Sequence, residues 1–431
     1  MISRFQKAGL KHAKAHIGTA RPLPWISLLT SCAGNMPSRP SLLLTLLALA
    51  PVLSAQETVV APPAAAVELT PTGAVNATAA GNTGAVVAPV APTRTEIAKT
   101  PVAAEVSKTP VGPDSRAFLF ENKPESFSAS AYTVSVESLI SAYERETGRT
   151  LKPGKKGKAG LKLYTNSGGG LATPVALTEA VCLALEKRGF KRPDILLVDQ
   201  QEKRLRESGY LPIIPDGKKL KFRGSPVLAL DTGKYFDTKP DSPWTYPSPL
   251  PSKDIVPGPD DFTFEPNRLE RVSLLPLPLL FDVDFWINLP VACDNSALGV
   301  AGALANATLY NVGNARRFWD TPANAQKAVV EIAAIPEIKE KLEFTIMPLE
   351  RYQVVGGPKF DAAFIVSEKR LWLSANPVIL DYLMWKRFNE ARVKLKFDPI
   401  DPEPGMFVTA NSGDIRLGSC RPSDLRLVEV K

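Results

Sequence analysis

The stretch from residue 160 to residue 190 contains the residue types of an anion-binding turn. It begins Gly-Leu-Lys-Leu-Tyr-Thr-Asn-Ser-Gly-Gly-Gly-Leu-Ala-Thr-Pro and continues as an amphipathic run to Phe190. This order predicts a strand, a glycine-rich turn and a helix in which Thr173 is the N-cap and Pro174 the first helical residue. Backbone N–H groups and a helix N-terminus would then face one point, which suits a phosphate or a carboxylate.

A tight turn that needs glycine only for its backbone geometry is the alternative interpretation of the same stretch. The turn lacks the Lys-Ser/Thr ending of a P-loop and the Gly-x-Gly-x-x-Gly spacing of a dinucleotide site. Neither class of nucleotide-binding protein is therefore supported.

Polar residues also recur on either side of residue 290. Asp282 and Asp284 alternate on a predicted strand, where they suit a hard cation, an acid/base pair or backbone hydrogen bonds. Asn306, Asn311 and Asn314 follow one another in a stretch of small residues. These amides could line a polar pocket or cap a closely packed helix.

Further charged and amide residues lie where predicted elements begin or end. Asp199 follows a predicted parallel strand, at the edge of an open α/β sheet where ligands bind. Asn376 and Asp381 open the last predicted helix, and the charge of Asp381 also suits the helix dipole. The adjacent Arg316 and Arg317 suit an anionic ligand or a solvated surface pair.

The composition excludes several kinds of catalysis. The chain has two histidines, and both fall in a leader that precedes the expected mature protein. A mature chain without histidine has no Ser-His-Asp or Cys-His nucleophile and no histidine-ligated zinc or iron. Cys182, Cys293 and Cys420 are too far apart for a Cys-x-x-Cys motif and allow at most one disulfide. The sequence indicates no metal site and identifies no cofactor.

The first 55 residues differ from the rest of the chain. They hold six of the 52 basic residues and none of the 44 acidic ones, so the formal charge of the remainder falls from +8 to +2. No nucleic-acid partner is therefore expected. Met36 to Ala55 resemble a secretory signal, which predicts a start at Met36 and export to the periplasm, cell envelope or extracellular space. A lipoprotein box ending at Cys32 and a mitochondrial presequence are the alternatives.

The rest of the chain is expected to be an α/β protein. Residues 56–115 are rich in Ala, Pro, Val and Thr, which predicts a disordered linker, and no transmembrane segment is expected in the mature chain. Residues 116–393 form the expected domain, and 394–431 a proline-punctuated, loop-like tail. A βαβ unit over 160–198 indicates a mostly parallel central sheet with flanking helices. Further strands are expected over 227–230, 281–291, 344–347 and 371–373, and further helices over 136–148, 322–335 and 376–392.

With these stretches identified, the chain resembles the family catalogued as domain of unknown function 362, some members of which carry ferredoxin-like iron–sulfur domains. Four segments match in order and span most of residues 160–390. They are Lys162 to Pro174, Ile287-Asn288-Leu289-Pro290-Val291, Gly299 to Asn306, and Ser374 to Asp381. The family has no generally established activity, so the resemblance implies the fold and the location of a pocket but no reaction.

The chain departs from the family pattern at cationic positions. After the Ile-Asn-Leu-Pro-Val segment the family typically continues Leu-Lys-x-His, where this chain has Ala292-Cys293-Asp294-Asn295. The family's Lys-Asn in the glycine-rich segment is Ala305-Asn306 here. If those groups bind metal or phosphate in the relatives, this chain has lost or altered that capacity.

The leading hypothesis is an exported α/β protein that binds a small polar or anionic ligand where the strands end. A hydrolase or transferase that uses Lys162, Asp199 and Asp381, with or without a divalent metal, is one alternative. A structural protein of the cell envelope is the other. The sequence assigns no catalytic residue. The candidate ligand contacts are Lys162, Thr165, Asn166, Gly168, Gly169, Thr173, Asp199, Asn306, Asn376 and Asp381.

Overall fold

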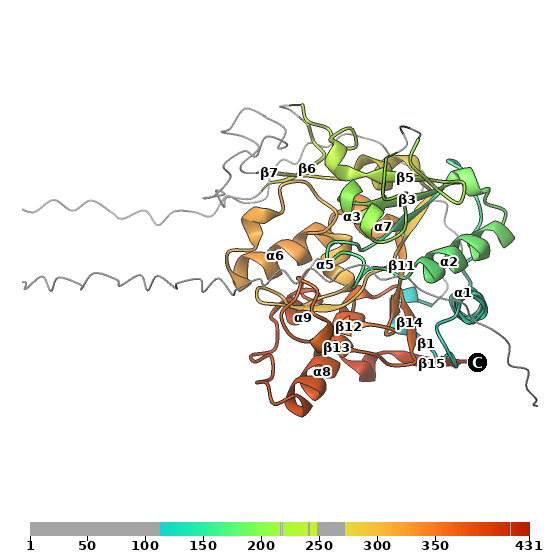
Figure 1. Cartoon of the computed structure of the whole chain (residues 1–431). Coiled ribbons are helices and arrows are strands. Elements are labelled where there is room, and N and C mark those ends of the chain that lie inside the picture. Colours follow the sequence, from blue (N-terminus) through green and yellow to red (C-terminus); the bar gives the residue numbers. More distant parts are fainter. Residues whose placement is uncertain (1–112, 216, 218, 240–241, 248–271, 414) are drawn as a thin grey trace, which may run out of the picture. The chain divides into compact units, whose positions relative to one another are not determined.

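The computed structural model describes residues 113–431 apart from 216, 218, 240–241, 248–271 and 414 (Figure 1). The signal segment and nearly all of the linker expected from the sequence therefore lie outside the described residues. The described part contains a nine-stranded sheet with helices on both faces. In sheet order the strands are β15 (Arg426–Val430), β1 (Phe118–Asn122), β14 (Leu371–Ser374), β11 (Leu342–Pro348), β8 (Phe285–Asn288), β2 (Ala159–Lys162), β3 (Ile195–Asp199), β5 (Ser225–Ala229) and β4 (Lys221–Phe222).

The sheet confirms the α/β class but is mixed, not mostly parallel as predicted. β11, β8, β2, β3 and β5 run parallel to one another. β14 runs antiparallel to both β1 and β11, and β4 runs antiparallel to β5. The β4–β5 pair needs no helical crossover, because Arg223 and Gly224 between the strands both have positive φ and form a tight hairpin turn.

The βαβ unit predicted over 160–198 is confirmed by β2, α2 (Val175–Lys187) and β3. Its helix begins one residue later than predicted, with Pro174 as the N-cap. The Thr173 hydroxyl does not cap α2 because it accepts from Tyr164 N–H at 2.8 Å and donates to the Leu289 carbonyl at 2.5 Å. The prediction of Thr173 as N-cap is therefore wrong, and its side chain instead ties the β2 end to the segment after β8.

Alternate side chains of the strands supply two apolar cores, one on each face of the sheet. Ile195 and Leu197 of β3 belong to the core under α1 (Ala129–Thr147), α2 and α3 (Glu202–Glu207). Leu196 and Val198 belong to the core of the opposite face. Figure 1 shows α1 and α2 together on one side of the sheet and α5, α6 and α8 on the other. The helices of that second side are α5 (Ala303–Ala307), α6 (Pro322–Ala333), α7 (Pro336–Lys341), α8 (Pro377–Lys394) and α9 (Met406–Thr409).

Two smaller sheets accompany the main one. A four-stranded sheet has the order β10 (Gly299–Ala301), β9 (Cys293–Asn295), β12 (Tyr352–Gln353) and β13 (Ile365–Val366), so β13 is an edge strand. β6 (Thr245–Pro247) pairs with β7 (Val272–Leu274). No helix in the described part of the chain is long and apolar enough to cross a membrane.

Most of the other predicted elements are present, and local capping explains their bounds. α1 ends at Gly148 with φ 69°, α6 begins after Thr321, and α8 begins after Asn376, whose side chain accepts from two helical N–H groups. The strand expected over 281–291 is shorter, because a π-helix occupies Pro278–Asp282 and β8 covers four residues. The tail expected to be loop-like contains α9 and β15.

Candidate functional site

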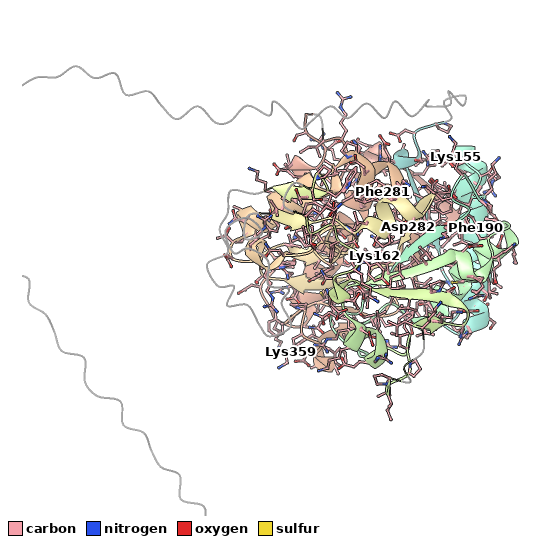
Figure 2. All side chains as sticks on the ribbon, turned by 90° about the horizontal axis from the view of Figure 1, so that it is seen from above. Lys155, Lys162, Phe190, Phe281, Asp282 and Lys359 are labelled. Atoms are coloured by element: carbon pink, nitrogen blue, oxygen red, sulfur yellow. The ribbon has the colours of Figure 1, made fainter. Side chains whose placement is uncertain are left out.

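A fully buried lysine lies at the carboxyl end of β2, in the interior of the fold (Figure 2). The Lys162 ammonium donates to Asp199 Oδ1 at 2.6 Å, to the Leu163 carbonyl at 2.5 Å and to Asn306 Oδ1 at 3.1 Å. An ammonium group has three N–H donors, so all of its donors are used. Lys162 therefore has no free N–H with which to hold a further ligand.

The hydrogen bonds continue on both sides of Lys162. Asp199 Oδ2 accepts from Thr165 Oγ1 at 2.6 Å. Asn306 Nδ2 donates to Asn288 Oδ1 at 2.8 Å, and Asn288 Nδ2 donates to Thr345 Oγ1 at 3.2 Å and to the carbonyl of the first α5 residue at 2.9 Å. Four adjacent parallel strands, β3, β2, β8 and β11, thus each supply a polar side chain. We call Thr165, Asp199, Lys162, Asn306, Asn288 and Thr345 the lysine network.

Burial and pairing act in opposite directions on this network. Burial lowers the pKa of Lys162, and the Asp199 carboxylate counteracts that effect. All six side chains are at most 1% exposed. Removing two charges from water costs free energy that their attraction recovers only with good geometry and satisfied hydrogen bonds, and both conditions hold here. The lysine network is therefore a closed polar core that joins the carboxyl ends of four central strands to α5.

Two further candidate residues, Asn376 and Asp381, instead accept hydrogen bonds from the N–H groups at helix N-termini. The Asn376 amide oxygen caps α8, and its Nδ2 donates to the Ser419 carbonyl at 2.8 Å. Asp381 accepts from Ala303 N–H at 2.6 Å and Leu304 N–H at 2.9 Å, the first two residues of α5. Burial raises the pKa of Asp381 to about 7. Both oxygens of this carboxylate are occupied, so it anchors α5 to α8.

Each glycine of the turn has a structural reason to be glycine. Gly168 has φ 79°, a conformation that side chains rarely adopt. A Cβ on Gly169 would lie 2.5 Å from the Glu207 carbonyl oxygen, and one on Gly170 would lie 2.5 Å from the Phe360 ring. The tight-turn interpretation therefore accounts for all three residues without an anion.

Four buried polar atoms near this turn have no hydrogen-bond partner among the described residues, out of six such atoms in the described part of the chain. They are Asn166 Oδ1, Tyr310 Oη, Asn311 Oδ1 and the Oγ of Ser208, a residue that lies beside Gly169. Gln200 connects the glycine-rich turn to residues 309–312. Its Oε1 accepts from Asn166 Nδ2 at 3.4 Å, and its Nε2 donates to the carbonyls of residues 309 and 312 at 3.2 and 3.4 Å. The Tyr164 and Tyr310 rings, 5.5 Å apart, also join the segments. We call Asn166, Gln200, Tyr310 and Asn311 the amide site.

Sequence reasoning did not identify Gln200 and Tyr310. Gln200 directly follows Asp199 at the β3 end, which is the signal that could have found it. Tyr310 follows a run of small residues, and an aromatic residue there is as typical of an apolar core as of a site. Asn288 and Thr345 were likewise not singled out for the lysine network, because one polar residue in a buried strand forms no pattern.

Of the remaining polar candidates, Asp282 and Arg316 are exposed, and others have structural partners. Asp284 accepts from three backbone N–H groups, those of Gly154, Lys156 and Lys158. Arg317 is buried, not solvated, and donates to Ser273 Oγ and to the Tyr246 carbonyl. Across the described ranges no group of three or more His, Cys, Asp or Glu side chains could hold a metal ion. The cysteines at 182, 293 and 420 are free.

Comparisons with known proteins give little further information. No family model matches the chain, and no curated protein matches it. Among solved structures it is similar to a crystal structure of a protein from Thermotoga maritima, with 12% sequence identity and a TM-score of 0.29. The match covers 53% of this chain and 52% of that one, so the chain spans about half the length of that protein. The resemblance to domain of unknown function 362 stays a prediction.

Proposed function

We propose that the protein binds a small polar ligand that donates hydrogen bonds, and that the amide site holds it. The observation that supports this proposal is the set of unpartnered atoms Asn166 Oδ1, Tyr310 Oη and Asn311 Oδ1 beside the carboxyl ends of β2 and β3. Leaving a buried polar atom unpaired costs about 1–3 kcal/mol, so such atoms in a native fold call for a ligand or water. A hydroxyl or ammonium compound would supply the missing donors.

An anionic ligand, which the sequence left open, is less well supported. The two unpartnered amide atoms are oxygens, and these repel a phosphate or carboxylate. The buried cation at the end of β2, Lys162, already uses its three N–H groups. The family positions that carry Lys and His are Ala and other residues in this chain, which also reduces the positive charge.

Binding is better supported than hydrolysis or group transfer. A general base needs a free lone pair within hydrogen-bond reach of the substrate. Asp199 and Asp381, the two acids of the enzyme hypothesis, are both 0% exposed and accept hydrogen bonds from the protein at both oxygens, so neither presents a lone pair to a substrate from solvent. Lys162 is 0% exposed and its Nζ is surrounded by three acceptors of the protein, so this nitrogen is not presented to a substrate as a nucleophile.

A thermal-shift experiment on the full chain tests the proposal. The probes are glycerol, glucose and ethanolamine as donors and inorganic phosphate as the anion. We expect at least one donor compound to raise Tm in proportion to the logarithm of its concentration, and phosphate to leave Tm unchanged. Asn311→Leu should abolish the shift. Its Tm without ligand should stay close to that of the wild type, because the substitution removes an unpaired oxygen together with one long hydrogen bond, from Asn311 Nδ2 to the Ala307 carbonyl at 3.3 Å.

Asn324→Leu on α6 is the matched control and should keep the ligand shift. Two outcomes contradict the proposal. A shift with phosphate alone would indicate an anion site. A drop in the Tm of unliganded Asn311→Leu, with no probe shifting the wild type, would mean that Asn311 has a structural role.

A further inference from the structure

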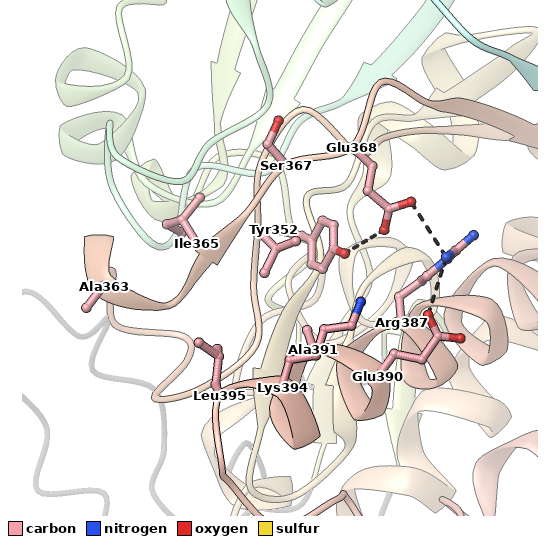
Figure 3. A pocket seen from close by; sticks show the side chains of 11 residues that line it. Tyr352, Ala363, Ile365, Ser367, Glu368, Arg387, Glu390, Ala391, Lys394 and Leu395 are labelled. Atoms are coloured by element: carbon pink, nitrogen blue, oxygen red, sulfur yellow. Dashed lines mark hydrogen bonds and ion pairs between the residues drawn. The ribbon is translucent and has the colours of Figure 1, made fainter.

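A groove separate from the amide site lies between the edge strand β13 and α8 (Figure 3). Its volume is about 500 Å³, within the range of pockets that hold a ligand or several side chains. Tyr352 and Val366 line it from the sheet, Glu368 lines it from the segment after β13, and Arg387, Ala391 and Lys394 line it from α8.

The outer edge of β13 has free backbone groups. Tyr352 pairs with Val366 and Gln353 with Ile365, in antiparallel register. Val354 N–H donates to the Phe364 carbonyl at 3.1 Å, so every second residue of β13 directs its backbone groups toward β12. The N–H and C=O of Ile365 therefore point outward, and within the described residues no strand lies on that side. An edge of this kind can pair with another strand.

The groove also has a single unpaired positive charge. Glu368 accepts from Tyr352 Oη at 2.7 Å, and Arg387 lies 3.4 Å from Glu390 and 3.8 Å from Glu368. Lys394 has neither a hydrogen bond nor an ion pair with any residue in the described part of the chain. Two apolar residues, Ala391 and the 42% exposed Leu395, lie close to it in sequence and also line the groove, beside the charged Arg387 and Glu390.

We infer that this groove binds an extended acidic peptide from a partner protein, which adds a strand to β13 and places a carboxylate on Lys394. Main-chain hydrogen bonds to Ile365 would supply affinity. Alternate side chains of the added strand point to the same face. A peptide with an acidic residue, and with apolar residues two positions before and two positions after it, therefore fits Lys394 and the neighbouring Ala391 and Leu395.

Fluorescence polarisation with the full chain and labelled peptides tests this inference. The probe is Ser-Val-Thr-Glu-Thr-Val-Ser, and its matched peptide has Lys in place of Glu. We expect the acidic peptide to bind at least ~10-fold more tightly, and its binding to slow hydrogen exchange at the Ile365 amide. In two further peptides every second backbone amide is N-methylated, starting from a different residue in each. One of the two should lose binding, because its methyl groups prevent the backbone hydrogen bonds to β13.

Variants of α8 and α6 complete the experiment. Lys394→Gln should abolish the preference for the acidic peptide, and Lys394→Glu should invert it. Lys327→Glu on α6, whose side chain is 68% exposed, makes the same charge change elsewhere and should leave binding unchanged. Equal affinity for both peptides, or tolerance of both N-methylated peptides, overturns the inference. Self-association of the chain that Lys394→Glu abolishes, without peptide binding, would show instead that the occupant is a second copy.

Discussion

Lys162 is an ammonium without solvent contact that has one carboxylate partner, Asp199, and two neutral acceptors. Its position follows from simple topology: β2 and β3 are parallel neighbours, so their carboxyl ends bring Lys162, Thr165 and Asp199 together. The sequence alone could indicate that these residues meet. It could not indicate that all their hydrogen-bonding groups find partners within the fold, because the third acceptor for Lys162 is Asn306 of α5.

Breaking this pair should be far more harmful than replacing it. We expect Lys162→Met to lower the free energy of unfolding by about 3–5 kcal/mol, because it leaves the Asp199 carboxylate buried without a cation. The double variant Lys162→Met with Asp199→Leu should recover most of that loss. Urea unfolding at pH 7 gives the free energy of unfolding of the wild type, the single variant and the double variant. A single variant within about 1 kcal/mol of the wild type would contradict the burial of this pair.

At the scale of elements, α5 is held from two directions. Asn306 joins it to the lysine network, and Asp381 holds its first two N–H groups from α8. A Cβ on Gly302 would lie too close to the Asp381 carboxylate, so the glycine before α5 permits this contact. The sequence predicted a helix-dipole role for Asp381 on its own helix. Its true partner is the start of another helix, and a contact between segments 78 residues apart leaves no local signal.

Asp381 should make stability depend on pH. Its folded pKa of about 7 lies above the ordinary value of 3.8, so between these values the folded state binds a proton that the unfolded state releases. Stability contributed by this group is therefore present at low pH and is lost as the pH rises through about 7, by at most ~1.4 kcal/mol per pH unit.

Denaturant unfolding between pH 4.5 and 7.5 checks this expectation. Asp381→Asn removes the titration and one of two acceptors, so the variant should gain stability relative to the wild type as the pH rises. Asp320→Asn is the control on an exposed aspartate and should show no such trend. A constant difference between wild type and Asp381→Asn would mean that the carboxylate does not titrate in this range.

The same scale explains what the sequence predicted well. Helix ends with local signals were predicted: Gly148 ends α1, Thr321 caps α6 and Asn376 caps α8. Thr173 fits the same pattern but bonds to Leu289, which lies 116 residues away. The glycine turn fits an anion site equally well until Glu207 and Phe360 are placed beside it. Tertiary contacts, not propensity, determine the hydrogen bonds of Thr173 and give the glycines a structural reason.

At the scale of the whole molecule, the sheet is mixed because the interior strand β14 and the edge strand β4 run against their neighbours. The parallel centre of β11, β8, β2, β3 and β5 was predictable from its βαβ pattern, because such strands are apolar runs joined by crossovers. β15 was not predictable, because none of its five residues is buried and the strand therefore has no apolar core pattern. It pairs in parallel with β1 along five residues, and Asn122 Nδ2 donates to the Val430 carbonyl at 2.9 Å.

Removing residues 425–431 should expose the edge of β1. We expect a loss of roughly 2 kcal/mol in unfolding free energy, the net worth of a few hydrogen bonds, and faster hydrogen exchange at Phe120. Thermal unfolding and exchange mass spectrometry measure both effects. Leu427→Ser keeps the strand and changes a side chain that is 56% exposed, so it should stay within about 0.5 kcal/mol of the wild type. A truncated chain as stable as the wild type would show that β15 contributes nothing.

The pairing of β1 with β15 also bears on how the protein is made. Asn122 and its partner Val430 are separated by 308 residues. At translation rates of about 5–20 residues per second, β1 is synthesised roughly 15–60 s before the strand that covers it. The pairing that covers this edge of β1 is therefore expected to be a late step in the folding of the chain.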